Sequence, residues 1–190
     1  MSANPVDRRA AIVRAGVGVL ASQGPRGFTH RAIDRLLGWP VGTVGNYFPT
    51  RESLLLATAV HMVEEDRKVL EPPPDGVEGL DEISVLISER IRTAVDPEHR
   101  ALFVARCELQ LEALRGGGKP EGADAVRQSF IDIAATWLTR AHVQRADRHA
   151  PAFAAFVDGL MWDQIVYSGT AVPLTELHVH IADFLRGCAS

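Results

Sequence analysis

Hydrophobic residues recur at intervals of three and four along almost the whole chain, which is the spacing of one face of an α-helix. No stretch shows the sustained alternation expected of a β-strand. Glycines and prolines divide the pattern, because glycine readily ends a helix and proline cannot continue one. The pattern predicts an all-α protein of about nine helices, near residues 5–23, 29–37, 40–47, 50–71, 78–95, 97–115, 121–143, 151–168 and 174–186.

The most informative local pattern lies in residues 29–48. Thr29 suits a helix N-cap, because its hydroxyl can accept a hydrogen bond from an N–H of the first turn, and Gly38 suits the end of that helix. Pro40 suits the first turn of a second short helix that is expected to reach Tyr47. Two short helices joined by a glycine-containing turn form a helix-turn-helix, whose second helix enters the major groove of DNA.

This region resembles the DNA-binding domain of the TetR family of transcriptional regulators. The matching segments are Gly27-Phe28-Thr29, Gly38, Gly42-Thr43-Val44 and Asn46-Tyr47-Phe48-Pro49-Thr50-Arg51-Glu52-Ser53-Leu54-Leu55, of which the run from Tyr47 to Leu54 is the most specific. The resemblance covers about residues 8–60 and rests on helical architecture beyond them. Two residues depart from the family pattern: Gly45 replaces an aromatic residue that touches the DNA backbone, and Val41 replaces a common lysine or glutamine.

The resemblance implies a DNA-binding domain at residues 1–52 and a helical effector-binding and dimerisation domain at residues 53–190, connected by the long helix after residue 50. It implies a homodimer, most simply a repressor that a small-molecule effector releases from a palindromic operator in double-stranded DNA. The two cysteines, Cys107 and Cys188, form no CxxC pair, which favours a reduced, cytoplasmic setting. Base edges are expected at Thr43 and Asn46, and phosphates at Thr29, Tyr47 and Arg51. His30 and Arg31 complete the expected DNA surface: Thr29, His30, Arg31, Thr43, Asn46, Tyr47 and Arg51.

The charge distribution favours DNA binding. The chain has a net charge of −4, but residues 1–55 carry seven arginines against three acidic residues, which gives +4. The remaining residues hold 13 basic and 21 acidic groups, which gives −8. The positive charge therefore lies on the segment expected to meet phosphates, as a DNA-binding surface requires. An ordinary solvated face would also account for this asymmetry.

The segment at residues 151–168 is apolar nearly all round, which indicates a helix that packs on two sides. Its small residues would allow another helix to approach closely, so a second subunit is a natural partner. A central helix in a monomeric bundle is the alternative, and the family resemblance favours the dimer. The expected dimer interface contains Ala155, Gly159, Trp162 and Val166, with Leu177 and Ile181 from the last helix.

The resemblance also implies a small-molecule pocket enclosed by the C-terminal helices, and candidate lining residues can be chosen because pockets combine apolar walls with a few polar groups. Its candidate residues are Phe103, Cys107, Gln110, Leu111, Trp137, Met161 and Gln164. Gln164 stands out because it interrupts an apolar face, and a bond to a backbone carbonyl is an equal alternative for it. The tryptophan and methionine could equally be plain core residues.

Other chemistry is weakly represented. The chain has no Glu-x-x-His pair for a di-iron bundle, no Gly-x-Ser-x-Gly motif and no glycine-rich phosphate loop after a strand. We therefore expect no enzyme activity, no cofactor and no metal. No apolar run reaches the roughly 20 residues that span a bilayer, so no membrane is expected as a partner. The main alternative is a helical small-molecule-binding protein with a degenerate helix-turn-helix, which the arginine-rich segment argues against.

Overall fold

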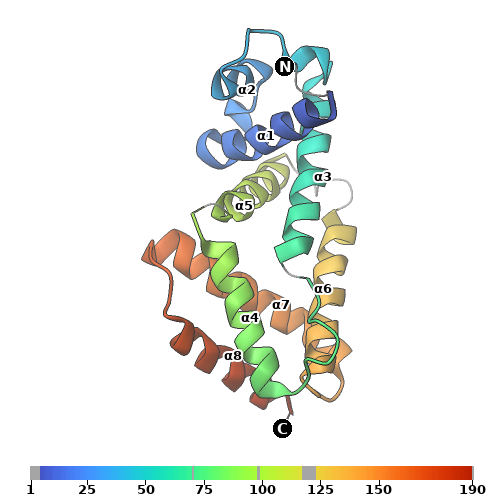
Figure 1. Cartoon of the computed structure of the whole chain (residues 1–190), viewed down its shortest axis with the longest axis vertical. Coiled ribbons are helices and arrows are strands. Elements are labelled where there is room, and N and C mark those ends of the chain that lie inside the picture. The colour runs from blue at the N-terminus through green and yellow to red at the C-terminus, as the bar shows by residue number, and fades with distance from the viewer. Residues whose placement is uncertain (1–4, 70, 98, 117–122, 190) are drawn as a thin grey trace. The chain divides into compact units, whose positions relative to one another are not determined.

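The structure is a computed structural model that describes residues 5–69, 71–97, 99–116 and 123–189. These residues form eight α-helices, one short 3₁₀-helix and one π-helical turn, with no strand among them (Figure 1). The predicted all-α fold class is therefore confirmed. The described residues divide into two compact units, one within Met1–Arg67 and Ala101–Pro120 and the other within Lys68–Arg100 and Glu121–Ser190.

The first unit is organised around α1 (Pro5–Gly27), which packs against α2 (His30–Leu37), and α2 in turn contacts η1 (Val44–Asn46). It also contains α3 (Arg51–Val69) and α5 (Arg100–Arg115). Its core is formed by apolar side chains that recur at helical spacing in the sequence, namely Ile12, Val19, Leu20, Phe28, Ile33, Val44, Phe48, Leu54, Met62 and Ala105. Burial of such side chains is the main term that stabilises a unit of this size.

Helix α1 breaks where the sequence predicts that it stops. Gly24 has φ 65° and ψ −176°, outside the helical region, and Pro25 follows it directly. Further back on α1, Gly16 lies close to α3, because a Cβ built on it would be only 2.7 Å from the hydroxyl oxygen of Thr58. A glycine is therefore needed at residue 16 for these two helices to approach each other.

The second unit is a bundle of α4 (Leu80–Val95), α6 (Ala123–Arg140), α7 (Ala146–Trp162), η2 (Asp163–Ser168) and α8 (Leu174–Ala189). Helix α6 packs along α7, and α4 packs along α8 and also contacts α6 and α7. The core includes Ile83, Ile87, Ile91, Trp137, Leu138, Phe153, Leu177, Ile181 and Leu185. Helix α7 begins at Ala146, five residues before Pro151, so the start expected at residue 151 is wrong. A proline near the start of a helix costs few hydrogen bonds, and the helix can therefore extend ahead of it.

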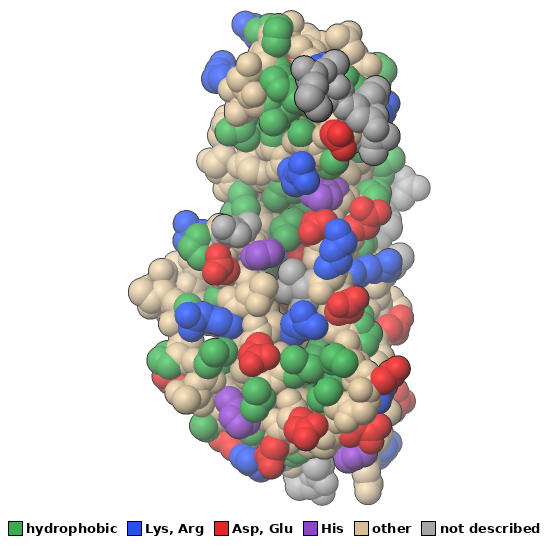
Figure 2. Space-filling view, viewed as in Figure 1, with side chains coloured by type: hydrophobic (Ala, Val, Ile, Leu, Met, Phe, Trp, Pro, Cys, Tyr) green, Lys and Arg blue, Asp and Glu red, His purple; other side chains and the backbone are tan. Residues whose placement is uncertain are grey.

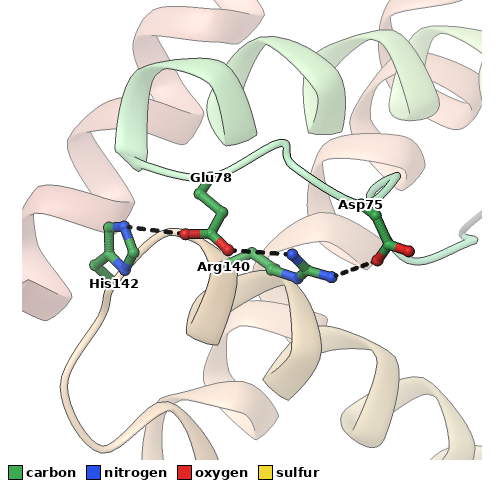
Figure 3. Close-up of polar contacts among 4 residues, drawn as sticks. All are labelled: Asp75, Glu78, Arg140 and His142. Carbon is green, nitrogen blue, oxygen red and sulfur yellow. Dashed lines mark hydrogen bonds and ion pairs between the residues drawn. The ribbon is translucent and has the colours of Figure 1, made fainter.

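A polar cluster ties the segment before α4 to the end of α6 (Figure 3). The guanidinium of Arg140 contacts Asp75 Oδ1 at 3.1 Å and Glu78 Oε1 at 3.2 Å, and His142 Nε2 lies 3.9 Å from Glu78 Oε2. The backbone N–H of Gly79 also donates to the Arg140 carbonyl at 2.8 Å. The charged groups are largely exposed, so each pair contributes little to stability. Together these contacts fix where the chain enters α4.

None of the described helices combines the length and apolar character that a membrane span requires. The face drawn in Figure 2 shows hydrophobic side chains scattered among acidic and basic ones. Exposed apolar residues that occur singly are normal on a protein surface.

Candidate DNA-binding surface and ligand cavity

The start of α2 is built as the sequence predicts. Thr29 is the N-cap, and its hydroxyl oxygen accepts a hydrogen bond from the Ala32 N–H at 3.1 Å. Gly38 ends the helix in the left-handed conformation, with φ 66°. Because the Thr29 oxygen acts as acceptor in the cap, its hydroxyl proton remains able to donate to an outside group such as a phosphate oxygen.

The second helix of the predicted helix-turn-helix is shorter than expected. A helix over residues 40–47 is wrong, because only Val44–Asn46 is helical and it is a 3₁₀ turn. The cause is Gly42, whose φ of 94° lies far from the helical region. We call residues 40–47 the recognition segment. Its Asn46 is exposed, and its Val41 side chain is 72% exposed.

A buried carboxylate holds the recognition segment against α2. Asp34 is only 1% exposed, and its two oxygens accept from the Gly42 N–H at 2.8 Å and the Val44 N–H at 2.9 Å. A buried polar group must be hydrogen-bonded to be tolerated, and here both oxygens are used. Sequence reasoning missed this role and counted Asp34 only among the three acidic residues in the net charge of residues 1–55. An acid next to the buried Ile33, a few residues before a glycine-rich turn, was the available signal.

His30 links the start of α2 to the end of the recognition segment. Its Nε2 lies 2.7 Å from the carbonyl oxygen of Phe48. A carbonyl can only accept, so Nε2 carries the proton in this contact. His30 is thus positioned by the protein itself, and its expected part in DNA contact stays a prediction.

Arg51 is likewise held by the protein. Its Nη2 donates to the Pro25 carbonyl at 2.7 Å and its Nε donates to the Phe28 carbonyl at 3.3 Å. These bonds satisfy carbonyls that follow the break in α1. The remaining donors of the exposed side chain are left for an outside acceptor.

The other expected DNA contacts lie on the same elements. Arg31 on α2 is exposed. The Thr43 hydroxyl donates to the Pro40 carbonyl at 2.6 Å, which leaves only its oxygen lone pairs for a base edge. The Tyr47 hydroxyl lies 3.5 Å from Nη1 of Arg8. The seven residues are therefore gathered on α2, the recognition segment and the start of α3.

Two arginines of α1 also reach this region. Besides its contact with Tyr47, Arg8 lies 5.8 Å from the centre of the Trp39 ring, and Arg9 lies 4.8 Å from the centre of the Phe48 ring. Such cation–π contacts orient a guanidinium without neutralising it. The start of α1 thus adds positive charge beside the recognition segment.

The second unit contains a cavity between α4, α6 and α7. Most of the residues that line it are apolar, and three are charged. The lining residues are Ile87, Arg90, Ile91, Arg127, Phe130, Ile133, Ala134, Trp137, Phe153, Ala154, Val157, Asp158 and Met161. The volume of the cavity is about 60 Å³. One water molecule needs about 10–15 Å³ of cavity volume measured in this way, so the cavity has room for a few water-sized groups. Apolar walls with few polar groups are typical of small-molecule sites.

Two of the seven expected pocket residues, Trp137 and Met161, line this cavity. Four others, Phe103, Cys107, Gln110 and Leu111, lie on α5, which belongs to the first unit, and are not among the lining residues. The seventh, Gln164, is buried in the π-helical turn. Its amide nitrogen donates to the Leu160 carbonyl at 2.9 Å, and its amide oxygen accepts from the Val172 N–H at 2.9 Å. Gln164 therefore fixes backbone, as the alternative interpretation held.

The expected dimer residues divide by exposure. Ala155, Gly159, Trp162 and Val166 are exposed on α7 and the turn after it. Leu177 and Ile181 are fully buried inside the protomer. They are core residues, so they drop out of the expected interface. Tyr167, Leu174 and Val179 are exposed apolar residues that sequence reasoning missed at this end of the chain.

No group of three histidine, cysteine or carboxylate side chains in the described ranges could hold a metal ion. Cys107 and Cys188 form no disulfide, and both are partly buried. Burial raises the pKa of the Cys188 thiol above its ordinary value. The described residues thus provide a protein surface in one unit and a cavity in the other as the candidate sites.

These features define a helical protein with a helix-turn-helix in one unit and a small-molecule-sized cavity in the other. Residues 79–189 match the family described as Tetracyclin repressor-like, C-terminal domain, and this match spans more than half of the chain. The chain therefore belongs to the TetR family of transcriptional regulators. No curated protein sequence matches it.

Several solved structures share the fold. A TetR-like transcriptional regulator from Rhodococcus sp. RHA1 superposes with a TM-score of 0.76 at 15% identity, covering 100% of both chains. GusR from Salmonella enterica gives 0.69 at 18% identity, covering 97% of this chain and 98% of its own. A protein from Saccharomonospora viridis, solved in complex with choline, gives 0.74 at 17% identity, covering 95% of this chain and 96% of its own. At such identities the similarity shows the fold alone.

Proposed function

We propose that this regulator is a homodimeric repressor that binds a palindromic operator through its recognition segments and leaves it when a small effector occupies the cavity of the second unit. The observation that carries the proposal is the anchoring of the recognition segment by buried Asp34, which keeps a short and glycine-rich element in one conformation. A rigid element is needed for base reading, because loosely held side chains select bases poorly.

The role proposed for each side chain on the DNA surface follows from the hydrogen-bonding groups that it does not use within the protein. Asn46 is exposed and its amide can both donate to and accept from a base edge, as asparagine does with adenine. Arg31 and Thr29 are placed at the start of α2, where a phosphate would meet positive charge and orphan N–H groups. Arg51 would contribute to DNA binding partly by holding the Pro25 and Phe28 carbonyls in place and partly through its remaining N–H donors.

The DNA-binding part is tested by selection from a random double-stranded library, followed by titration of the selected site. Asn46→Ala is expected to change which bases are preferred. Arg31→Ala is expected to weaken all selected sequences about equally and to lower the salt slope by about one. Arg51→Ala is a poor probe, because it also removes two hydrogen bonds inside the protein. If no sequence is enriched at moderate salt, the repressor proposal fails.

That failure would favour a second candidate, a helical small-molecule-binding protein whose helix-turn-helix no longer reads DNA. The specific observation in its favour is the recognition segment itself, which has only one 3₁₀ turn and lacks a side chain at Gly45. The two candidates separate in one experiment, because only the repressor enriches a sequence from the library.

The dimer is proposed to form through the exposed surface of Ala155, Gly159, Trp162 and Val166. Gly159 provides a direct test, since a Cβ built there meets nothing within 4 Å in the protomer. Gly159→Trp should therefore fold normally and block dimer formation, and Gln144→Trp, at an exposed position in the turn before α7, is the matched control. Sedimentation at micromolar concentration should give a dimer for the wild type and the control, and a monomer for Gly159→Trp. A monomeric wild type would reject the proposed assembly.

The effector is proposed to occupy the cavity between α4, α6 and α7. A neighbour of the same fold is in complex with choline, which supports ligand binding as a use of the fold. An effector can shift DNA affinity only by its differential affinity for the two states, typically about 1–3 kcal/mol. By reciprocity, operator DNA must weaken effector binding by the same factor, and titrations with and without operator measure it.

A further inference from the structure

The charged groups of the cavity in the second unit do not cancel one another. The cavity is lined by Arg90, Arg127 and Asp158 among otherwise apolar residues. Two cations and one anion leave a formal charge of +1 at this site. A buried polar atom is costly unless it is hydrogen-bonded, so the way these three side chains pair bears on what the cavity can bind.

Arg127 and Asp158 pair with each other. Nη1 of Arg127 lies 3.6 Å from Asp158 Oδ2, and its Nη2 donates to the Pro151 carbonyl at 3.5 Å. Both side chains are roughly half exposed at the rim. Water therefore screens them, and the pair neither adds nor removes net charge at the cavity.

Arg90 is the cation that remains. The residue as a whole is partly buried, but its Nε is fully buried and no described residue accepts a hydrogen bond from that atom. No carboxylate in the described part of the chain forms an ion pair with its guanidinium. Arg90 lies on α4 between Ile87 and Ile91, which line the same cavity, so the unsatisfied donor belongs to an apolar surrounding. Buried donors without partners are rare in folded proteins and call for an explanation.

A carboxylate would explain Arg90. The guanidinium is always charged and presents parallel N–H groups whose spacing matches the two oxygens of a carboxylate. The aromatic rings of Phe130, Trp137 and Phe153 would meanwhile pack against an apolar body. The small volume of the cavity limits that body to a few atoms.

We propose that the cavity binds a small monocarboxylic acid with an apolar body, and that Arg90 is the residue that selects its carboxylate. This inference rests on the proposed role of the cavity as the effector site. It goes beyond that role because it states the charge of the ligand. Cations are selected against, since the unpaired Arg90 repels them and the aromatic walls offer only a modest compensating attraction.

Three probes of equal length but different charge test the selection: pentanoate, pentanamide and pentylammonium. Calorimetric titration of the purified protein without DNA is expected to give pentanoate an affinity at least about tenfold higher than that of the amide, because a charged hydrogen bond replaces a neutral one. The ammonium should bind more weakly than the amide. The proposal is overturned if the amide or the ammonium binds as well as pentanoate, or if none of the three binds at millimolar concentration.

Arg90→Met assigns the selection to this side chain, and Arg92→Met on the exposed face of the same helix is the control with the same change in charge. Arg90→Met should lower the affinity for pentanoate by about tenfold or more and leave that for the amide almost unchanged. It removes a buried unsatisfied donor, so its melting temperature should not fall. Arg90→Lys keeps the charge and loses the planar guanidinium, so its affinity for pentanoate should lie between those of wild type and Arg90→Met. Unchanged preference in both Arg90 variants would reject the assignment.

Adding operator DNA separates this inference from the proposed function. If pentanoate binds through Arg90 but leaves DNA affinity unchanged, the acid site stands and the effector role fails. If another compound releases the DNA and binds equally well to wild type and Arg90→Met, the effector role stands and the acid site fails.

Discussion

Replacing Asp34 with asparagine should loosen the recognition segment more than any other single change on the DNA surface. The carboxylate is buried and accepts two backbone N–H bonds, from Gly42 and Val44. Asparagine keeps one acceptor oxygen and turns an NH₂ group towards the other N–H. Hydrogen bonds to charged groups contribute about 1.5–3 kcal/mol each, and a buried unsatisfied donor costs about 1–3 kcal/mol. We expect a loss of about 2–4 kcal/mol in the free energy that keeps this segment in place.

Hydrogen exchange measures that loss directly. A change of about 2–4 kcal/mol corresponds to roughly 30-fold to 1,000-fold faster exchange of the Gly42 and Val44 amides, if local opening governs them. Glu52→Gln, at an exposed residue in the first turn of α3, is the matched control and should leave both amides unchanged. Operator affinity should fall for Asp34→Asn and not for the control. Unchanged exchange at both amides, with an unfolding free energy within about 0.5 kcal/mol of wild type, would refute the idea that Asp34 anchors the recognition segment.

Three further predictions concern single positions. Gly42→Ala should destabilise the first unit by about 1–2 kcal/mol, because φ is 94° there, whereas Gly45→Ala should be neutral or slightly stabilising, since a Cβ meets nothing within 4 Å; urea unfolding compares them. Gly16→Ala should destabilise by about 1–3 kcal/mol, because its Cβ would meet the hydroxyl oxygen and the methyl carbon of Thr58. Adding Thr58→Ala removes both atoms and should recover part of this loss in the same urea experiment, and no recovery would reject the close approach as its cause. Iodoacetamide at pH 8 should alkylate Cys188 more slowly than free cysteine, because its raised pKa lowers the thiolate fraction.

Helix positions were predictable where local chemistry sets them. Thr29 and Gly38 define the two ends of α2 through bonds to their own neighbours, and both appear as predicted. The recognition segment was not predictable in the same way, because Gly42 is compatible with a helix in sequence terms and its positive φ is fixed by a bond to Asp34 from another element. The early start of α7 shows the same limit, since Pro151 marks a helix start well but does not exclude an earlier one.

The sites show a similar division. Residue type and family pattern predicted a set of DNA contacts that lie on neighbouring elements. They did not predict the hydrogen bonds that hold Arg51 and His30 to backbone carbonyls. In the second unit, helical spacing identified Trp137 and Met161 as inward-facing. It could not identify Arg90, because whether an arginine has a partner depends on which acids other helices bring near it.

The shortness of the recognition segment limits how much sequence one protomer can distinguish. Besides Tyr47 and the exposed Pro40, whose ring carries no hydrogen-bonding group, the side chains of the segment with accessible surface are those of Val41, Thr43 and Asn46. If each makes one good base contact, discrimination amounts to about 1–3 kcal/mol per contact, or a factor of roughly 10²–10⁶ for the three. A genome offers about 10⁶–10⁹ competing positions. A single protomer would therefore be bound mostly to incorrect sites in the genome. Only two linked protomers, whose discrimination factors multiply, would distinguish one site from all others.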